Sequence, residues 1–386
     1  MFDILQRSAL QQPQWADDAQ LQHVQQELKN CPALVDAKAV CMLRSMLAGV
    51  ARGESYVLQA GDCAENPAEC TAHHVARKVR LLNVLADVME MNTRKPVVQV
   101  GRIAGQFGKP RSELTERVGD LELPVYRGHM VNSPEPYLVE RQPDPQRLLN
   151  CYQTASEVVG HLGWRSPSWQ LRVNPPVWIS HEALLLDYEI PMLRRNNDGR
   201  LLLASTHWPW IGERTRQVDG AHVALLANVV NPVACKVGPS VLVGELLALC
   251  EKLDPRRELG RLTLIARMGA EVVADLLPPL VEAVRAEGYP VIWLCDPMHA
   301  NTVTTPNGLK TRFVETLVQE VKNFQGAVRA SGGTAGGLHL ETTPDAVTEC
   351  VTNKSNIDQA SACYTSFCDP RLNQRQAVSV VSAWSG

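Results

Sequence analysis

Short apolar runs that end in polar or glycine-rich turns recur along most of the chain. From the third run to the sixth, successive starts lie roughly 30 residues apart, which is the length of a strand–helix repeat. Nearly continuous apolar runs are typical of parallel strands that are buried on both faces. The eight runs are YVLQAG (56–61), VVQVG (97–101), LLLAS (201–205), VACKVG (233–238), LTLIAR (262–267), VIWLCD (291–296), GLHLE (337–341) and ACYTSFCD (362–369).

Segments with helical spacing lie before the first run and between several of the others. Leu21, Val24 and Leu28 fall on one face of a predicted helix, and a second helix follows after a break at Asn30–Pro32. Further helices are predicted at 71–91, 240–253, 270–287 and 308–324. The glycine-rich segment at 332–337 is expected to form a turn.

This alternation predicts an α/β protein with a closed (β/α)8 TIM barrel. We expect an N-terminal helical extension over 1–55, a catalytic barrel over 56–386, and an insertion between the second and third strands over 105–200. That insertion includes a helix near Arg147–Val159 and the segment at 180–189. A doubly wound sheet is the alternative, but it usually has fewer strands and a glycine-rich fingerprint, and no GxGxxG follows any run.

The composition excludes several classes of protein. Of the 386 residues, 45% are apolar and 20% are charged, which is a globular balance. Lys and Arg number 38 against 41 Asp and Glu, so the net charge of −3 argues against a nucleic-acid partner. Eleven cysteines without close pairing indicate reduced thiols. No apolar stretch is long enough to span a membrane and no leader peptide is recognisable, so we expect a cytoplasmic protein.

Polar residues follow the predicted strands, at the end of a barrel where active sites lie. Four of them combine sulfur, nitrogen and oxygen donors that suit one divalent transition metal: Cys63, His299, Glu341 and Asp369. Taken alone, Cys63 fits a small buried residue and His299 a structural one, while Glu341 and Asp369 fit helix caps. Their shared placement after separate strands favours the metal site.

Several cations also follow the strands, although the chain is acidic overall. Guanidinium groups suit phosphate and carboxylate oxygens, and lysine adds a point charge or a proton. A metal Lewis acid beside several anion-binding side chains suggests a carbonyl reaction between phosphorylated substrates. The cations are Arg102, Lys109, Arg111, Arg214, Lys236 and Arg267.

Several long motifs, in a fixed order from about Tyr56 to the C-terminus, resemble the type II 3-deoxy-D-arabino-heptulosonate 7-phosphate (DAHP) synthases. Two positions depart from the family pattern: Ala300 stands where Gly is usual, and Thr-His-Trp at 206–208 replaces a more usual Ala-His-Phe. The resemblance implies a metal-dependent (β/α)8 barrel. The motifs are GDCAE, RIAGQFGKPRS, WIGERTRQVDGAHV, NPVACKVGPS, DPMHANT followed by KTR, GGLHLE and CDPRLNQRQAV.

The resemblance implies a role for each matching residue. It makes Cys63, His299, Glu341 and Asp369 the ligands of one divalent metal, with Mn²⁺ or Co²⁺ as first choices and Zn²⁺ or Fe²⁺ as further ones. It assigns phosphoenolpyruvate to Arg102, Glu213, Arg214, Lys236 and Arg267, and erythrose 4-phosphate to Lys109, Arg111 and Ser112. The implied catalytic residues are Lys236 as proton donor or anion binder, Glu213 as the residue that orients a water, and His299.

The implied activity is the condensation of phosphoenolpyruvate with erythrose 4-phosphate and water to give DAHP and phosphate, the first step of the shikimate pathway. We expect a homo-oligomer, a dimer or a tetramer. The short chain resembles forms that supply chorismate for secondary metabolism, with phenazine production as the first choice. Two alternatives stay open here: a synthase that takes an amino-sugar phosphate, and a catalytically silent homologue that regulates a partner.

The predicted connections from the third strand onward are close to minimal, which leaves little room there for an effector site. We therefore expect Trp, Phe and Tyr at millimolar concentration, singly and in pairs, to leave the initial rate almost unchanged. Initial rates of phosphate release with and without the amino acids measure this. Strong inhibition by a pair would instead indicate an effector pocket in the insertion at 105–200.

Overall fold

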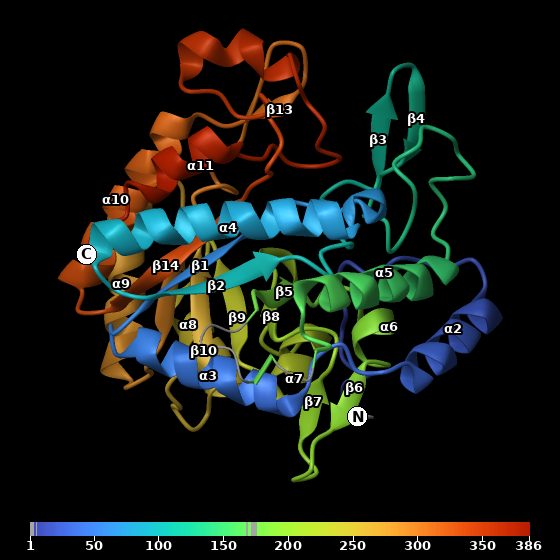
Figure 1. The fold of residues 1–386 in the computed structure, drawn as a ribbon, viewed down its shortest axis with the longest axis horizontal. Helices are drawn as coiled ribbons and strands as arrows, with labels where there is room; N and C mark the ends of the chain where they lie inside the picture. The colour runs from blue at the N-terminus through green and yellow to red at the C-terminus, as the bar shows by residue number, and fades with distance from the viewer. Residues whose placement is uncertain (1–3, 5, 167–168, 171–175) are drawn as a thin grey trace. The chain divides into compact units, whose positions relative to one another are not determined.

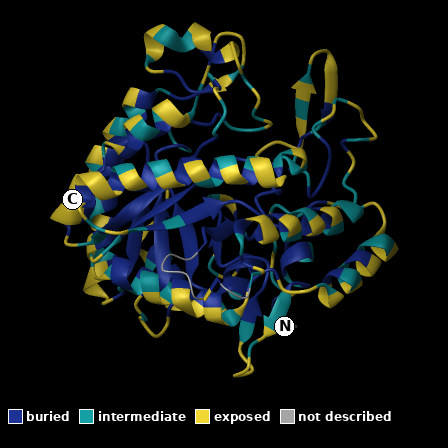
Figure 2. Cartoon of the chain, viewed as in Figure 1, coloured by how far each residue is buried: buried dark blue, intermediate teal, exposed yellow. Residues whose placement is uncertain are grey.

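Eight parallel strands form one closed barrel, which confirms the (β/α)8 fold (Figure 1). The computed structural model describes residues 4, 6–166, 169–170 and 176–386. Around the barrel the order is β1-β14-β11-β10-β9-β8-β5-β2, and most strand residues are buried (Figure 2). The strands are β1 (Tyr56–Gly61), β2 (Val97–Arg102), β5 (Trp178–Glu182), β8 (Trp208–Ile211), β9 (Val233–Val237), β10 (Leu262–Ala266), β11 (Ile292–Cys295) and β14 (Thr334–Glu341).

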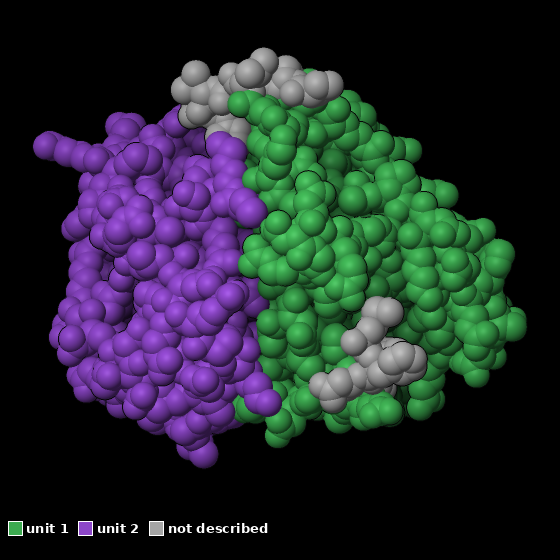
Figure 3. All heavy atoms as spheres, turned by 90° about the horizontal axis from the view of Figure 1, so that it is seen from below, with its two compact units in different colours: residues 1–40, 64–76, 103–231 green, residues 41–63, 77–102, 232–386 purple. Residues whose placement is uncertain are grey.

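The chain divides into two compact units, coloured separately in Figure 3. Unit 1 comprises residues 1–40, 64–76 and 103–231, and unit 2 comprises 41–63, 77–102 and 232–386. The separation of an extension over 1–55 from a barrel over 56–386 remains a prediction. No helix in the described part of the chain is both long and apolar enough to cross a bilayer.

The described residues of unit 1 form four α-helices and two small antiparallel hairpins besides β5 and β8. The helix expected near residues 147–159 is confirmed as α5, which ends at Gly163 in the left-handed conformation (φ 92°). The helices are α2 (Asp18–Asn30), α5 (Gln146–Leu162), α6 (Leu186–Glu189) and α7 (Ala221–Ala227), and the hairpins are β3 (Thr115–Val118) with β4 (Leu121–Pro124) and β6 (Leu193–Arg195) with β7 (Leu201–Leu203).

Unit 2 holds the other six barrel strands and the helices that pack on them. Helix α9 packs against both α8 and α10, and α10 packs against β14 and β11. Two helices, α3 (Ala37–Ala51) and α4 (Ala72–Thr93), begin in unit 1 and end in unit 2. The remaining elements are α8 (Val243–Leu253), α9 (Val273–Ala286), α10 (Val314–Ala330), α11 (Gln374–Val381) and the hairpin of β12 (Val303–Thr304) with β13 (Lys310–Thr311).

Two of the eight expected strands are wrong. Residues 201–203 form β7, which pairs with β6 outside the barrel, and 362–369 form turns and bends after the 3-10 helix Lys354–Ser361. Their barrel positions belong to β5, which lies in the segment assigned to the insertion, and to β8. Strand β8 contains Pro209, and proline ordinarily argues against a strand inside a sheet because it cannot donate a ladder hydrogen bond.

Strand β14 begins at Thr334, so the glycines expected in a turn partly lie inside a strand. Its register against β11 shifts between Trp293 and Leu294, which leaves Gly336 as an extra residue in a β-bulge. A Cβ on Gly336 would lie 2.3 Å from Ile292 Cγ2, and one on Gly337 would lie 1.9 Å from the Val57 carbonyl oxygen. Only glycine therefore lets β14 pass so close to both neighbours.

Helix α10 carries a buried carboxylate that binds two loops of unit 2. Glu320 accepts hydrogen bonds from the backbone N–H groups of Met268 (3.2 Å) and Gly269 (2.9 Å) and from Asn301 Nδ2. Burial raises the pKa of Glu320 to about 7, although the hydrogen bonds from Gly269 and Asn301 oppose the rise. The segments after β10 and β11 are thereby attached to the same helix.

Replacing Glu320 by Gln should change how stability depends on pH. The pKa of Glu320 is about 7 when folded and 4.5 ordinarily, so the folded protein binds the extra proton in this window and its free energy of unfolding falls as pH rises through it. The variant cannot bind this proton and so does not lose stability with it. Its free energy of unfolding, relative to that of wild type, should therefore rise by about 3 kcal/mol between pH below 4.5 and pH above 7. Urea unfolding across the window, with the exposed Glu315→Gln as control, measures the difference. A constant difference would contradict the assignment.

Candidate active site

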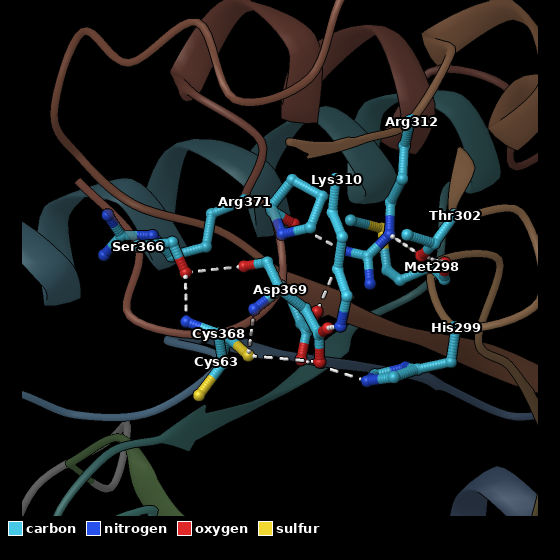
Figure 4. A network of polar contacts seen from close by, with 12 residues as sticks. Cys63, Met298, His299, Thr302, Lys310, Arg312, Ser366, Cys368, Asp369 and Arg371 are labelled. Carbon is cyan, nitrogen blue, oxygen red and sulfur yellow. Dashed lines mark hydrogen bonds and ion pairs between the residues drawn. The ribbon is translucent and has the colours of Figure 1, made fainter. Parts of the chain in front are cut away.

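Three of the four predicted metal ligands lie together in unit 2. One donor atom each of Cys63, Glu341 and Asp369 lies within 4.8 Å of the other two. The Cys63 Sγ atom is 3.6 Å from Asp369 Oδ2, and His299 Nε2 is 3.1 Å from Glu341 Oε1. Figure 4 shows Cys63, His299 and Asp369 pointing toward one another. The four side chains thus form one group, although they are far apart in the sequence.

The elements that carry these side chains differ in part from expectation. Cys63 follows β1 and Glu341 is the last residue of β14, both at the carboxyl end of a barrel strand, and His299 follows β11. Asp369 does not follow a strand, because the segment expected as the eighth strand is a loop. The loop reaches the group through Asp369, whose backbone N–H lies 3.3 Å from Cys63 Sγ.

The donor set fits a divalent transition metal. A thiol, an imidazole nitrogen and two carboxylates provide the mixed ligands that such ions accept. Cys63 and Glu341 have no exposed surface, so their donor atoms are shielded from water and face the other members of the group. The residues present are therefore suited to holding such an ion.

A carboxylate behind His299 orients its ring. Asp296 Oδ2 lies 2.7 Å from His299 Nδ1, and Oδ1 accepts from the His299 backbone N–H at 3.3 Å. Burial alone would raise the pKa of Asp296, but His299 and Lys236 outweigh it and hold that pKa well below its ordinary value. With Nδ1 donating to Asp296, Nε2 is the ring nitrogen left for a metal, as in many metal sites.

Lys236 and Arg267 stand beside this pair. Lys236 Nζ donates to Asp296 Oδ2 at 2.7 Å, and Arg267 Nη2 donates to the His299 carbonyl oxygen at 3.0 Å. Burial lowers the pKa of Lys236, an effect that the charge of Asp296 opposes. Both predicted cations therefore contact the segment that carries His299.

Arg102, at the end of β2, is held by a histidine that the sequence did not indicate. Arg102 donates from Nη2 to Glu341 Oε1 (3.0 Å) and from Nη1 to His339 Nε2 (2.9 Å), while His339 Nδ1 lies 2.7 Å from Gln59 Oε1. Burial lowers the pKa of His339 well below its ordinary value, and Lys236 and Arg102 lower it further. A neutral ring is consistent with accepting from Arg102. The sequence signal that could have indicated His339 is its position two residues before Glu341, because alternate residues of a strand share a face.

In unit 1, a buried carboxylate shapes the loop that follows β2. The oxygens of Glu65 accept hydrogen bonds from the backbone N–H groups of Ala104 (3.1 Å), Gly105 (2.8 Å) and Gln106 (2.8 Å). Lys109, further along the loop, is buried with 6% of its surface exposed. The motif GDCAE thus contributes its cysteine to the metal group and its last glutamate to this loop.

The other predicted residues of unit 1 are partly brought together. Arg214 Nη2 donates to Ser112 Oγ at 2.8 Å, although Arg214 lies in the 3-10 helix Glu213–Thr215 and Ser112 in the loop after β2. Arg111 pairs with Glu116 (2.9 Å). Glu213 Oε1 accepts from Arg216 at 3.0 Å, whereas its Oε2 is buried without a hydrogen-bond partner in the part of the chain that the structure describes.

Comparison with known proteins identifies the family. The sequence matches the model of the Class-II DAHP synthetase family over residues 3–168 and 167–383. The chain belongs to this family. It is 56% identical to a "Probable phospho-2-dehydro-3-deoxyheptonate aldolase" of Pseudomonas fluorescens, an alignment that covers all of this chain and 97% of the relative.

More distant relatives are also named as phospho-2-dehydro-3-deoxyheptonate aldolases. The phospho-2-dehydro-3-deoxyheptonate aldolases of Mycolicibacterium smegmatis and Streptomyces coelicolor are 38% and 39% identical; the alignments cover 97% and 96% of this chain and 91% and 93% of the relatives. A solved phospho-2-dehydro-3-deoxyheptonate aldolase structure from Francisella tularensis has the same fold, with a TM-score of 0.56 over 98% of each chain at 12% identity. The resemblance to this family of synthases is confirmed.

Replacing Cys63 by Ser should weaken Co²⁺ binding by at least about 100-fold, because a hydroxyl is a far poorer ligand than a thiolate and loss of outer partners alone already costs 10–100-fold. The thiolate-to-cobalt absorption band should also disappear. Titration against a competing chelator measures the affinity, with Cys250→Ser, a buried cysteine of α8, as the matched control. An unchanged affinity would remove Cys63 from the ligand set.

Proposed function

We propose that Cys63, His299, Glu341 and Asp369 hold one divalent metal, Mn²⁺ or Co²⁺ in the first place, and that the chain works as a DAHP synthase. It is a transferase that condenses phosphoenolpyruvate with erythrose 4-phosphate and water to give DAHP and phosphate, the first step of the shikimate pathway. The observation that carries the metal site is the approach of a thiol and two carboxylates from three segments to within 4.8 Å. Membership of the family supports the reaction.

The metal, when bound, supplies a Lewis acid for the aldehyde oxygen of the sugar phosphate. The chain's part is to orient the ligands. Asp296 fixes the His299 ring, and Arg102 holds Glu341 from the side of β2. Ligands that are already oriented do not need to reorganise when the metal and the substrate bind.

Arg102, Lys236 and Arg267 are the proposed partners of phosphoenolpyruvate. This substrate carries a carboxylate and a phosphate, which suit two guanidinium groups and an ammonium group. All three cations lie in unit 2: Arg102 and Arg267 contact the proposed ligands Glu341 and His299, and Lys236 contacts Asp296, which orients His299. Holding the enolpyruvate there lowers the entropic cost of its reaction with a second anion.

Residues of unit 1 are the proposed partners of erythrose 4-phosphate and of the water. Lys109, Arg111 and Ser112 would bind the sugar phosphate, with Arg214 donating to Ser112. After C3 of the enolpyruvate attacks the aldehyde carbon, a water adds to C2 and phosphate leaves. Glu213 is suited to orient that water, because its Oε2 has no hydrogen-bond partner among the described residues.

For the setting of the reaction we propose a cytoplasmic homo-oligomer, a dimer or a tetramer. We further propose that its product supplies chorismate for secondary metabolism, with phenazine production as the first choice. The reduced cysteines implied by the sequence support the cytoplasmic setting.

Phosphate release from the two substrates together should require the metal. Excess chelator should abolish it, and Mn²⁺ or Co²⁺ should restore it; each substrate alone should give none. Lys236→Met should lower the metal-restored rate by about 100-fold or more, as expected for a lost donor to an anion, whereas the exposed Lys252→Met should not. Full activity in excess chelator would contradict the metal site, and no release with any metal would contradict the reaction.

A further inference from the structure

Arg312, a buried residue just after β13, contacts all three chain segments that carry the later metal ligands. Its Nη1 donates to Glu341 Oε2 at 2.9 Å and to the carbonyl oxygen of Pro370, the residue after Asp369. Its Nε donates to Thr302 Oγ1 at 3.0 Å, three residues after His299. The Arg312 side chain has no exposed surface.

A second cation, Lys310, lies two residues before Arg312 in the chain. Lys310 Nζ donates to Asp369 Oδ1 at 2.8 Å and is 46% exposed. Between the two cations, the Thr311 hydroxyl donates to the Glu349 carbonyl oxygen at 2.8 Å. Alternate residues of extended chain project to the same side, so Lys310 and Arg312 both reach the ligand group.

The two cations divide the oxygens of the ligand carboxylates. Oε2 of Glu341 accepts a hydrogen bond from Arg312. Its Oε1 faces His299 Nε2 at 3.1 Å and also accepts from Arg102. Oδ1 of Asp369 accepts a hydrogen bond from Lys310, while its Oδ2 lies 3.6 Å from Cys63 Sγ. In each carboxylate, one oxygen therefore accepts from Lys310 or Arg312, and the other oxygen faces the remaining predicted ligands.

We propose that Arg312, assisted by Lys310, is the positioning residue of the metal centre. It fixes which oxygen of Glu341 faces the metal, and it holds the segments of His299 and Asp369 at the spacing that four ligands require. Glu341 and Asp369 then each bind through one oxygen. The inference rests on the proposed function, since it takes Cys63, His299, Glu341 and Asp369 as the ligands.

Two effects of Arg312 on metal affinity oppose each other. Its positive charge repels a divalent ion, whereas its hydrogen bonds keep the Glu341 carboxylate facing the ligand group. Without Arg312, Glu341 would lose the donor to its Oε2, while Arg102 and His299 both contact Oε1, the oxygen that a metal needs. Orientation therefore outweighs repulsion, and removal of Arg312 lowers metal affinity.

The test uses Co²⁺ as the probe and the full-length protein. Chelator competition gives the dissociation constant, and the cobalt spectrum reports the number and kind of ligands. Arg312→Met should weaken binding by about 10–100-fold, the range for loss of an outer-shell partner, and change the ligand-field bands. The thiolate band should remain, because the hydrogen bonds of Arg312 go to Thr302, to Glu341 and to the Pro370 carbonyl oxygen and so act on the segments of the other three ligands. Arg312→Lys should recover part of the loss through its retained charge.

The matched control is Arg261→Met. Arg261 is also buried, with 6% of its surface exposed, and donates to the Leu253 carbonyl oxygen at 2.9 Å, away from the ligands. This variant should lose stability but keep the wild-type constant for Co²⁺. An equal loss of affinity in Arg261→Met would show that general destabilisation explains the effect. Wild-type affinity and spectrum in Arg312→Met would overturn the proposal directly.

Lys310→Met keeps the test decisive if Arg312→Met does not fold, because position 310 is half exposed. It should weaken Co²⁺ binding by about two- to fivefold, as expected for an exposed pair. Tighter binding would show that repulsion outweighs orientation, and wild-type constants in both Lys310→Met and Arg312→Lys would overturn the positioning role. If the wild-type protein itself binds no Co²⁺, the proposed metal centre fails as well, so the two failures are distinguishable.

Discussion

The buried charge of Glu341 is the constraint on which the centre of unit 2 depends. Its carboxylate has no exposed surface, and an uncompensated charge there would cost several kcal/mol. Arg102 and Arg312 compensate it, His299 lies beside it at 3.1 Å, and each of the three comes from a different part of the chain. The carboxylate therefore fixes β2, the segment after β11 and the segment after β13 relative to the end of β14. Burial would lower the pKa of Arg312, but Glu341 and Asp369 outweigh it and raise that pKa, so the arginine stays charged.

A second set of buried charges supports the same centre from the side of β1. Asp62, the residue before Cys63, forms ion pairs with Lys78 at 2.6 Å and with Arg371 at 2.9 Å. Arg371 also pairs with Glu349 at 2.8 Å. Burial would raise the pKa of Asp62, but Lys78 and Arg371 outweigh it, so the carboxyl is ionised. The segments that carry Cys63 and Asp369 are thus connected by ion pairs that lie outside the ligand group.

The sequence predicts the barrel where apolar runs are continuous, and it fails where function or packing interrupts them. Six runs correspond to barrel strands, but β5 contains Ser180 and His181, and His181 is buried against Glu189 at 2.8 Å. Candidate ligands were recognisable because most follow strands. Arg312 was not, because it lies beyond a short hairpin outside the barrel and its role exists only through contacts with segments distant in sequence.

The bulge in β14 decides which residues of that strand face the charged interior. Side chains alternate, so the extra Gly336 reverses their parity: Leu294 pairs with Gly337, and His339 and Glu341 fall on the same side as Gly337. If one residue of this segment were deleted, Leu338 and Leu340 would face the interior and Glu341 would face α10. The number of residues in this segment therefore decides which side chains of β14 face the interior, as much as the identity of those residues does. A single-residue deletion here should displace the Glu341 carboxylate from the buried group as a substitution of Glu341 would, although it removes no polar side chain.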